Sequence, residues 1–309
     1  MVKQIQTVSV VGAGLMGHGV ALTFAKMGFG VIVTDPAEGA LQSLHRRVED
    51  SMVSMGTDRD LIEIALRNIS FDNDLATAVR NTDLVIEAGP ENLEIKRKIF
   101  ADVEAAVSDD CILASNTSVL PITQIMAELT NKERALGTHW WNPPHLIPLV
   151  EVIKTQWSDN DVVEQVIELL ASLGKQPVRV DKDIPGFVGN RLQHALWREA
   201  ISLVENRICS AEAVDTVVKA SFGRRLGVLG PLENADLVGT DLTLDIHETV
   251  LSDLDSRGEP SPYLRFLVET GKLGMKTGEG FKKWKDDEPD QLRDRVAQHL
   301  MAQNTIENN

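Results

Sequence analysis

His139 and Glu151 are two residues whose types and spacing suit proton transfer. His139 ends a short apolar run, Glu151 lies inside the next one, and a turn separates them that contains Pro143, Pro144 and Pro148. Histidine titrates nearest to neutrality, so it can exchange a proton with a substrate. A carboxylate beside its ring would fix the tautomer and stabilise the imidazolium. The alternative is a structural histidine in a stiff loop between buried strands, and this stretch alone favours the alternative.

A glycine-rich segment near the N-terminus supplies a second signature. The apolar run 8–11 leads directly into a GxGxxG pattern, a helix-like stretch follows, and the apolar run 31–34 ends on Asp35. In this context the glycines allow a tight turn and a close approach of a pyrophosphate, and the helix start binds the phosphates. An acid at the position of Asp35 hydrogen-bonds the adenosine ribose and repels a 2′-phosphate. The segment therefore predicts an NAD site that comprises Gly12, Gly14, Leu15, Met16, Gly17 and Asp35.

Further apolar runs indicate the strands that must position these residues. Segments 84–88, 111–114, 135–138 and 149–153 have the composition of buried strands. Ser115-Asn116-Thr117-Ser118 follows one of them at its carboxyl end, where open parallel sheets bind ligands. Capping of the next helix by Thr117 or Ser118 is a compatible alternative. A carboxylate inside an apolar strand needs a partner, and His139 is the nearest candidate for Glu151 in sequence.

Pro185-Gly186 marks the expected boundary between two domains. Before it, strands and helices alternate, which predicts an α/β, Rossmann-like domain over residues 1–184, with a charged helical hairpin inserted at 37–68. After it the strand pattern stops, which predicts an all-α domain over residues 185–309. A long helix at 187–206 would carry Asn190 early, where this residue could face the crevice between the domains or solvent.

Composition restricts the classes of partner. The formal net charge is −15, and such a surface repels nucleic acid and anionic membranes, so a small-molecule substrate is the expected partner. The chain has two cysteines, which argues against a disulfide scaffold or a metal site and favours a cytoplasmic location. We expect no signal peptide and no membrane-spanning segment, because a strand begins by Val8 and no apolar run is long enough.

Taken together, the motifs resemble those of the L-3-hydroxyacyl-CoA dehydrogenase family. Besides the segments above, the resemblance rests on Pro185-Gly186-Phe187-Val188-Gly189-Asn190-Arg191 and on Lys276-Thr277-Gly278-Glu279-Gly280-Phe281. It runs from Val8 to about Trp284. It implies an NAD cofactor, a Rossmann-like domain and an all-helical C-terminal domain through which two copies form a homodimer, with a place in fatty acid metabolism.

The resemblance also implies a role for each matching residue. His139 matches the general base that takes the proton of the substrate 3-hydroxyl, and Glu151 matches its orienting carboxylate. Ser118 and Asn190 match residues that hydrogen-bond the substrate oxygen. Further matches on the cofactor side are Glu91, Lys96, Asn116 and Lys276. For Glu91 and Lys96, pairing with the helix dipole and a solvated helix face are equally good interpretations of the sequence.

Three departures from the family pattern concern the substrate. Acyl-CoA members usually have two phenylalanines and then Asn-Pro-Val after the histidine. This chain has Trp140-Trp141 and then Asn142-Pro143-Pro144 at these positions. The Asn-Pro-Pro form is similar to the branch that contains lambda-crystallin (L-gulonate 3-dehydrogenase) and a pyridine-carboxylate dehydrogenase. The helical hairpin, which is lysine-rich and binds CoA in the family, is weakly basic here. Arg225, like Asn142 a candidate substrate residue, could hold a free carboxylate.

The sequence therefore predicts an NAD-dependent oxidoreductase that interconverts a 3-hydroxyacyl substrate, with 3-hydroxyacyl-CoA or 3-hydroxybutyryl-CoA as the leading candidate, and its 3-oxo form. The first alternative is a dehydrogenase of a free hydroxy acid, similar to L-gulonate or a pyridine carboxylate. A non-catalytic, crystallin-like NAD-binding protein is the alternative from a different class, and it would not require the residues at all four catalytic positions.

Overall fold

The structure, a computed structural model, describes residues 4–307 and divides into two compact units. The first unit comprises the chain up to Arg191 together with the stretch from Ala297 onwards, and the second is Leu192–Val296. The first unit contains the predicted dinucleotide-binding region, and the second contains the helices that follow it.

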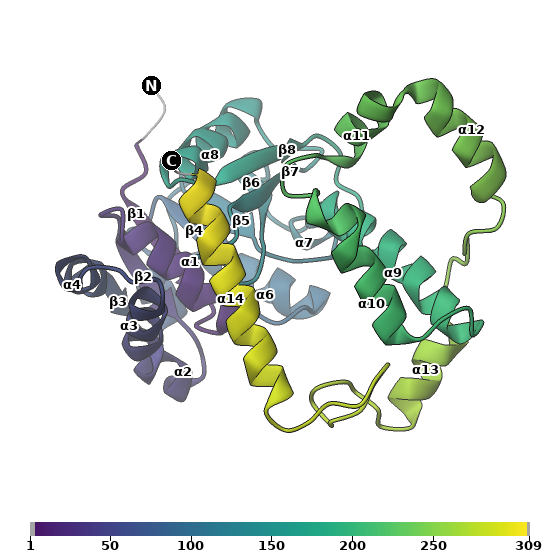
Figure 1. Cartoon of the computed structure of the whole chain (residues 1–309). Helices are drawn as coiled ribbons and strands as arrows, with labels where there is room; N and C mark the ends of the chain where they lie inside the picture. The colour runs from purple at the N-terminus through teal and green to yellow at the C-terminus, as the bar shows by residue number, and fades with distance from the viewer. Residues whose placement is uncertain (1–3, 308–309) are drawn as a thin grey trace. The chain divides into compact units, whose positions relative to one another are not determined.

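One eight-stranded sheet forms the centre of the first unit, in the order β3-β2-β1-β4-β5-β6-β7-β8 (Figure 1). Neighbouring strands are parallel except β6 and β7, which pair antiparallel. The strands are β1 Thr7–Val11, β2 Gly30–Thr34, β3 Ile69–Phe71, β4 Leu84–Glu87, β5 Ile112–Ser115, β6 Ala135–Trp140, β7 Leu149–Lys154 and β8 Gln176–Val180. Because β1, β4 and β5 are parallel neighbours, their carboxyl ends meet at one edge of the sheet.

Helices cover both faces of this sheet. Along β4, Leu84 and Ile86 belong to one hydrophobic cluster and Val85 belongs to another, as expected where successive side chains point to opposite faces. The first cluster includes residues of α1, α3, α4 and α8, and the second includes residues of α5, α6 and α7. The helices of this unit are α1 Leu15–Ala25, α2 Glu38–Gln42, α3 Leu44–Ser54, α4 Arg59–Arg67, α5 Leu75–Val79, α6 Leu93–Glu104, α7 Ile122–Ile125 and α8 Asn160–Ser172.

Two helical segments differ in detail from the sequence prediction. The inserted hairpin consists of three helices, α2, α3 and α4, where two pieces were expected. Helix α6 begins after Asn92, because the Asn92 side chain accepts a hydrogen bond from the backbone of Ile95 at 3.1 Å and acts as the N-cap. Glu91 therefore precedes the helix and is free to contact a neighbouring loop.

The regular elements of the second unit are helices, apart from two isolated β-bridges within 274–283. Its helices are α9 Gly189–Glu205, which begins in the first unit, α10 Ala211–Ala220, the 3₁₀ turn Phe222–Arg224, α11 Pro231–Val238, α12 Thr240–Val250, α13 Pro262–Glu269 and the start of α14 Glu288–Glu307. The predicted combination of a Rossmann-like sheet domain with a helical C-terminal domain is confirmed. None of the helices found within residues 4–307 has both the length and the apolar character needed to cross a membrane.

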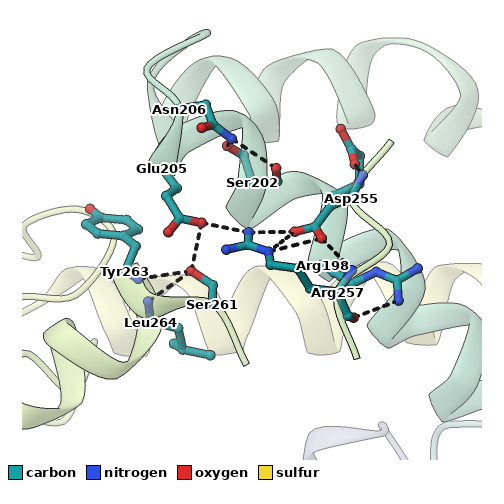
Figure 2. A network of polar contacts seen from close by, with 10 residues as sticks. Arg198, Ser202, Glu205, Asn206, Asp255, Arg257, Ser261, Tyr263 and Leu264 are labelled. Atoms are coloured by element: carbon teal, nitrogen blue, oxygen red, sulfur yellow. Dashed lines mark hydrogen bonds and ion pairs between the residues drawn. The ribbon is translucent and has the colours of Figure 1, made fainter. Parts of the chain in front are cut away.

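A polar network ties the end of α9 to the segment between α12 and α13 (Figure 2). Arg257 donates to Glu205 at 2.7 Å and to Asp255 at 2.6 Å. Ser261, the N-cap of α13, donates to the same Glu205 oxygen at 3.1 Å. Glu205 thereby holds both the connecting segment and the start of α13 against the end of α9.

Candidate active site

The β6–β7 pair brings His139 and Glu151 together. The two residues are directly opposite each other in the antiparallel register, and His139 Nδ1 lies 2.8 Å from Glu151 Oε2. Both are almost fully buried. Burial raises the pKa of Glu151, but hydrogen bonds from His139 and from the backbone N–H groups of Gly189 and Val188 together bring it below its usual value. The carboxylate is therefore ionised near neutrality.

An ionised Glu151 determines the tautomer of His139. A carboxylate can only accept, so Nδ1 must carry a hydrogen and donate it. In the neutral imidazole the lone pair then resides on Nε2. This is the arrangement that a general base requires, with one ring nitrogen held by an acid and the other able to take a proton.

Two hydrogen bonds connect the turn after β5 to segments next to this pair. Asn116 accepts one from the backbone N–H of Trp140 at 2.9 Å, the residue that follows His139. Asn190 Nδ2 donates to the backbone oxygen of Ser118 at 2.8 Å. The structure thus connects all four residues for which catalytic roles were predicted, although the roles themselves remain predictions.

Glu91, which lies between β4 and α6, also holds the turn that carries Ser118. One of its oxygens accepts from the backbone N–H groups of Ser118 and Val119, both at 3.3 Å, and from the hydroxyl of Thr117. Its other oxygen is 3.7 Å from Lys96 Nζ. Glu91 thus contacts the turn that carries Ser118, and Lys96 lies beside Glu91. Their roles toward the cofactor remain predictions.

Glu87 is a residue that the sequence analysis missed. It ends β4, is fully buried, and accepts from Lys96 Nζ at 2.7 Å and from Ser115 Oγ at 2.6 Å. Lys96 is itself fully buried, so Glu87 compensates its charge. The available signal was the same as for Glu151, a carboxylate at a buried strand position.

The glycine-rich loop has the shape that a dinucleotide requires. Gly12 has a φ of +113°, and a Cβ there would lie 2.6 Å from the backbone oxygen of Ala88. A Cβ on Gly17 would lie 1.7 Å from the oxygen of Gly12, whereas one on Gly14 would meet nothing within 4 Å. Helix α1 begins at Leu15 with Gly14 as its N-cap, and it has no side-chain cap and no acid in its first turn. Backbone N–H groups at this start suit a pyrophosphate, so the predicted residues fit NAD.

Asp35 and an unpredicted arginine hold this loop. Asp35 accepts from the backbone N–H of Ala13 at 2.7 Å, which places its carboxylate beside the loop as predicted. Arg47 of α3 donates to the oxygens of Gly14 at 3.1 Å and Ala40 at 2.9 Å, and also to that of Ala13. The hairpin was expected to be an exposed insertion, and only these long-range contacts reveal that Arg47 supports the loop.

Three predicted residues are not connected to these contacts. Asn142 is exposed in the turn between β6 and β7. Lys276 and Arg225 are exposed in the second unit. Lys276 lies in a tight loop in which Gly274 and Gly278 both have positive φ values, +74° and +76°. Their roles toward cofactor and substrate remain predictions.

Comparison with protein families agrees with the resemblance seen in the sequence. The family model described as "3-hydroxyacyl-CoA dehydrogenase, NAD binding domain" matches residues 7–184, and that described as "3-hydroxyacyl-CoA dehydrogenase, C-terminal domain" matches residues 186–284. The 5-formyl-3-hydroxy-2-methylpyridine 4-carboxylate 5-dehydrogenase of Mesorhizobium japonicum is 35% identical over 96% of this chain and 97% of its own. The human mitochondrial hydroxyacyl-coenzyme A dehydrogenase is 37% identical over 91% and 92%.

Solved structures of dehydrogenases are also similar to this chain. The crystal structure of an NAD⁺-dependent 5-formyl-3-hydroxy-2-methylpyridine 4-carboxylic acid 5-dehydrogenase has a TM-score of 0.90 and 33% identity, covering 98% of each chain. That of (S)-3-hydroxybutyryl-CoA dehydrogenase from Ralstonia eutropha has a TM-score of 0.76 and 32% identity, covering 91% of this chain and 100% of the other. These neighbours support NAD as the cofactor of this chain.

Gly14→Ala should weaken NADH binding while leaving the fold intact. The added methyl group meets no protein atom within 4 Å. It would obstruct the pyrophosphate, whose close approach requires a glycine at this position, so the dissociation constant of NADH should rise ~10-fold or more. The cost to stability should stay within about 1 kcal/mol, as for other N-cap substitutions. Fluorescence titration with NADH and thermal unfolding measure the two effects.

Gly39→Ala is the matched control, because its Cβ also meets nothing within 4 Å but lies outside the loop. It should leave NADH binding unchanged. Wild-type affinity in Gly14→Ala would contradict this cofactor site.

Proposed function

The chain belongs to the 3-hydroxyacyl-CoA dehydrogenase family and is an NAD-dependent oxidoreductase, and we propose that its substrate is a compact free hydroxy acid rather than a CoA thioester. The sequence favoured 3-hydroxyacyl-CoA, with a free acid as the alternative. The contacts of the helical hairpin now favour that alternative.

The observation that carries the proposal is the use of the hairpin's arginines within the protein. Arg47 donates to the backbone oxygens of Gly14 and Ala13 in the cofactor loop. Arg59 pairs with Glu49 at 2.6 Å and lies 3.7 Å from Glu63. A CoA 3′-phosphate needs cations that are available to it, and two of the hairpin's arginines already have partners.

Similarity over the full chain points in the same direction. The TM-score of 0.90 to the pyridine-carboxylate enzyme covers 98% of this chain, whereas the 3-hydroxybutyryl-CoA dehydrogenase matches 91% with 0.76. The name of the first enzyme describes a small aromatic substrate with a free carboxylate. We infer a substrate of similar size for this chain, with a free carboxylate.

In the proposed mechanism His139 Nε2 takes the proton of the substrate hydroxyl. Glu151 stabilises the imidazolium that forms, because its ionised carboxylate already faces Nδ1. Ser118 and Asn190 hydrogen-bond the reacting oxygen. NAD, held by the glycine loop and Asp35, supplies the hydride acceptor when it is bound. In the reverse direction His139 returns the proton to the same oxygen.

A 3-hydroxyacyl-CoA thioester remains the second candidate. It is favoured by the descriptions of both matching family models and by relatives such as the probable 3-hydroxybutyryl-CoA dehydrogenase of Bacillus subtilis, which is 36% identical over 92% of this chain. Both candidates share the His139–Glu151 chemistry, so they differ only in what the protein recognises outside the reacting carbon.

A substrate panel separates the two candidates. Oxidation of NADH should be followed with acetoacetyl-CoA, free acetoacetate and 5-formyl-3-hydroxy-2-methylpyridine 4-carboxylate, and reduction of NAD with the last compound as well. At least one free acid should exceed the thioester in kcat/KM by ~10-fold or more, the discrimination expected from one well-made charged contact. A preference for acetoacetyl-CoA would overturn the free-acid proposal.

His139→Gln should abolish turnover and leave NADH binding nearly unchanged. Glutamine occupies the same region but takes no proton, and the loss of a general base costs ~10²–10⁴-fold in rate. Steady-state rates on the best substrate of the panel and NADH fluorescence test the two halves of this prediction. Turnover that survives in His139→Gln would show that another group is the base.

We also propose that the second unit forms a homodimer. Helices α11 and α12 contain no buried residue in the chain, and Leu232 and Leu237 are 80% and 73% exposed. Apolar surface of this kind is unusual in a monomer and suits a second copy of the same chain.

Sedimentation equilibrium tests the homodimer directly. The wild type should have twice the chain mass of 34.0 kDa, and Leu232→Glu should lower it to one chain mass, since the new charge would be buried against a partner. Val53→Glu, at a residue 58% exposed on α3, is the control and should remain dimeric. A monomeric wild type would exclude the proposal.

Finally, we propose a cytoplasmic location. A chain of this size with two cysteines has no need of an oxidising compartment for its fold. The relatives with bacterial sources include enzymes that act on small metabolites, which fits this location.

A further inference from the structure

The residues just before α9 adopt an unusual backbone conformation. Phe187 has a φ of +48°, in the left-handed region that non-glycine residues seldom occupy. Its side chain is fully buried, and its ring lies 5.5 Å, between centroids, from that of His139. Conformations of this kind are retained where the surrounding structure imposes them, often at functional sites.

This conformation aims two backbone donors at one carboxylate oxygen. Glu151 Oε1 accepts from the N–H of Val188 at 2.8 Å and from that of Gly189 at 3.0 Å. Glu151 Oε2 faces His139 Nδ1 at 2.8 Å. One oxygen of Glu151 is thus held by the 187–189 turn, and this leaves the other at a fixed position beside the imidazole.

Trp141 holds the turn in place. A Cβ on Gly189 would lie 2.4 Å from Trp141 Cζ2 and 3.3 Å from Cε2 and Cη2, so the indole packs directly against the glycine backbone. The same indole lies 5.2 Å, between centroids, from the His139 ring. Trp141 therefore contacts the base itself and also the turn that supports the carboxylate of the base.

We propose that Trp141 and Gly189 are a matched pair of positioning residues: the indole fits only where residue 189 has no side chain, and together they hold the 187–189 turn against Glu151. The proposal rests on the proposed role of His139 as the base. It explains why an enlarged residue at 141, where acyl-CoA members usually have phenylalanine, is compatible with an ordered site. The pair acts on the reaction through Glu151 and His139.

Gly189→Ala should displace the turn and weaken both of its hydrogen bonds to Glu151. With fewer donors left to offset burial, the pKa of Glu151 rises. Since an ionised Glu151 is needed beside His139, the acid limb of the kcat/KM profile for hydroxyl oxidation should move to higher pH. The value of kcat should fall by ~10²-fold, as for small misplacements of catalytic groups. NADH affinity should stay within ~3-fold of wild type, because the cofactor loop is untouched.

Trp141→Phe provides the rescue. Phenylalanine lacks Cζ2 and Cη2, and Cζ2 is the indole atom that an alanine at 189 would meet most closely, at 2.4 Å. Trp141 Nε1 has no hydrogen-bond partner among the described residues, so this substitution breaks no such bond. The double variant Gly189→Ala/Trp141→Phe should therefore return the acid limb to within a few tenths of a pH unit of wild type and recover at least ~10-fold of the lost kcat. Gly39→Ala, with open space around its Cβ, is the control and should change neither quantity.

The outcomes separate this proposal from the proposed function. An unshifted acid limb in Gly189→Ala, or a double variant no better than the single one, overturns the pairing of Trp141 with Gly189 while wild-type turnover and its loss in His139→Gln stand. Turnover that survives in His139→Gln overturns the base instead. If Gly189→Ala does not fold, recovery of folding and of the wild-type acid limb in the double variant supports the pairing, and failure of both overturns it.

Discussion

A carboxylate inside a sheet must recover by hydrogen bonds the hydration that it loses on burial, and Glu151 meets this constraint with three donors. These donors come from two different parts of the first unit. The antiparallel β6–β7 register supplies His139, and the turn before α9 supplies the two backbone N–H groups. Burial of the carboxylate would cost free energy if any of these donors were lost. The interactions that stabilise Glu151 in the sheet therefore also fix the tautomer of His139.

The same constraint acts a second time at the end of β4. Glu87 and Lys96 are both fully buried, and their charges compensate each other at 2.7 Å. Lys96 then approaches Glu91, which accepts hydrogen bonds from the turn that carries Ser118. Two buried carboxylates, Glu87 and Glu151, are therefore each compensated by a basic side chain, and the turn that carries Ser118 is held by backbone hydrogen bonds to Glu91.

Features formed by residues close together in the sequence could be predicted, whereas contacts between distant residues could not. The glycine loop and Asp35 form a local pattern with one known geometry, so the sequence predicts both the βαβ unit and its cofactor. Glu151 was recognisable because a charge in an apolar strand demands a partner. Arg47, by contrast, lies 33 residues from the Gly14 oxygen that it contacts, and no periodicity encodes that contact. The φ of Phe187 was equally invisible, because phenylalanine has no local preference for the left-handed region.

The sequence predicts the reaction better than the substrate, because different residues are responsible for the two. Proton transfer needs a few groups in fixed geometry, and buried partners force that geometry wherever the motif occurs. The residues predicted to recognise the rest of the substrate, Asn142 and Arg225, are exposed, so no packing requirement fixes their identity. Trp141 lies between these two groups of residues, because its indole contacts the buried His139 and the next residue, Asn142, is exposed. A change at this position must suit the packing of the turn before α9 as well as the substrate, so the size of residue 141 is linked to the absence of a side chain at Gly189.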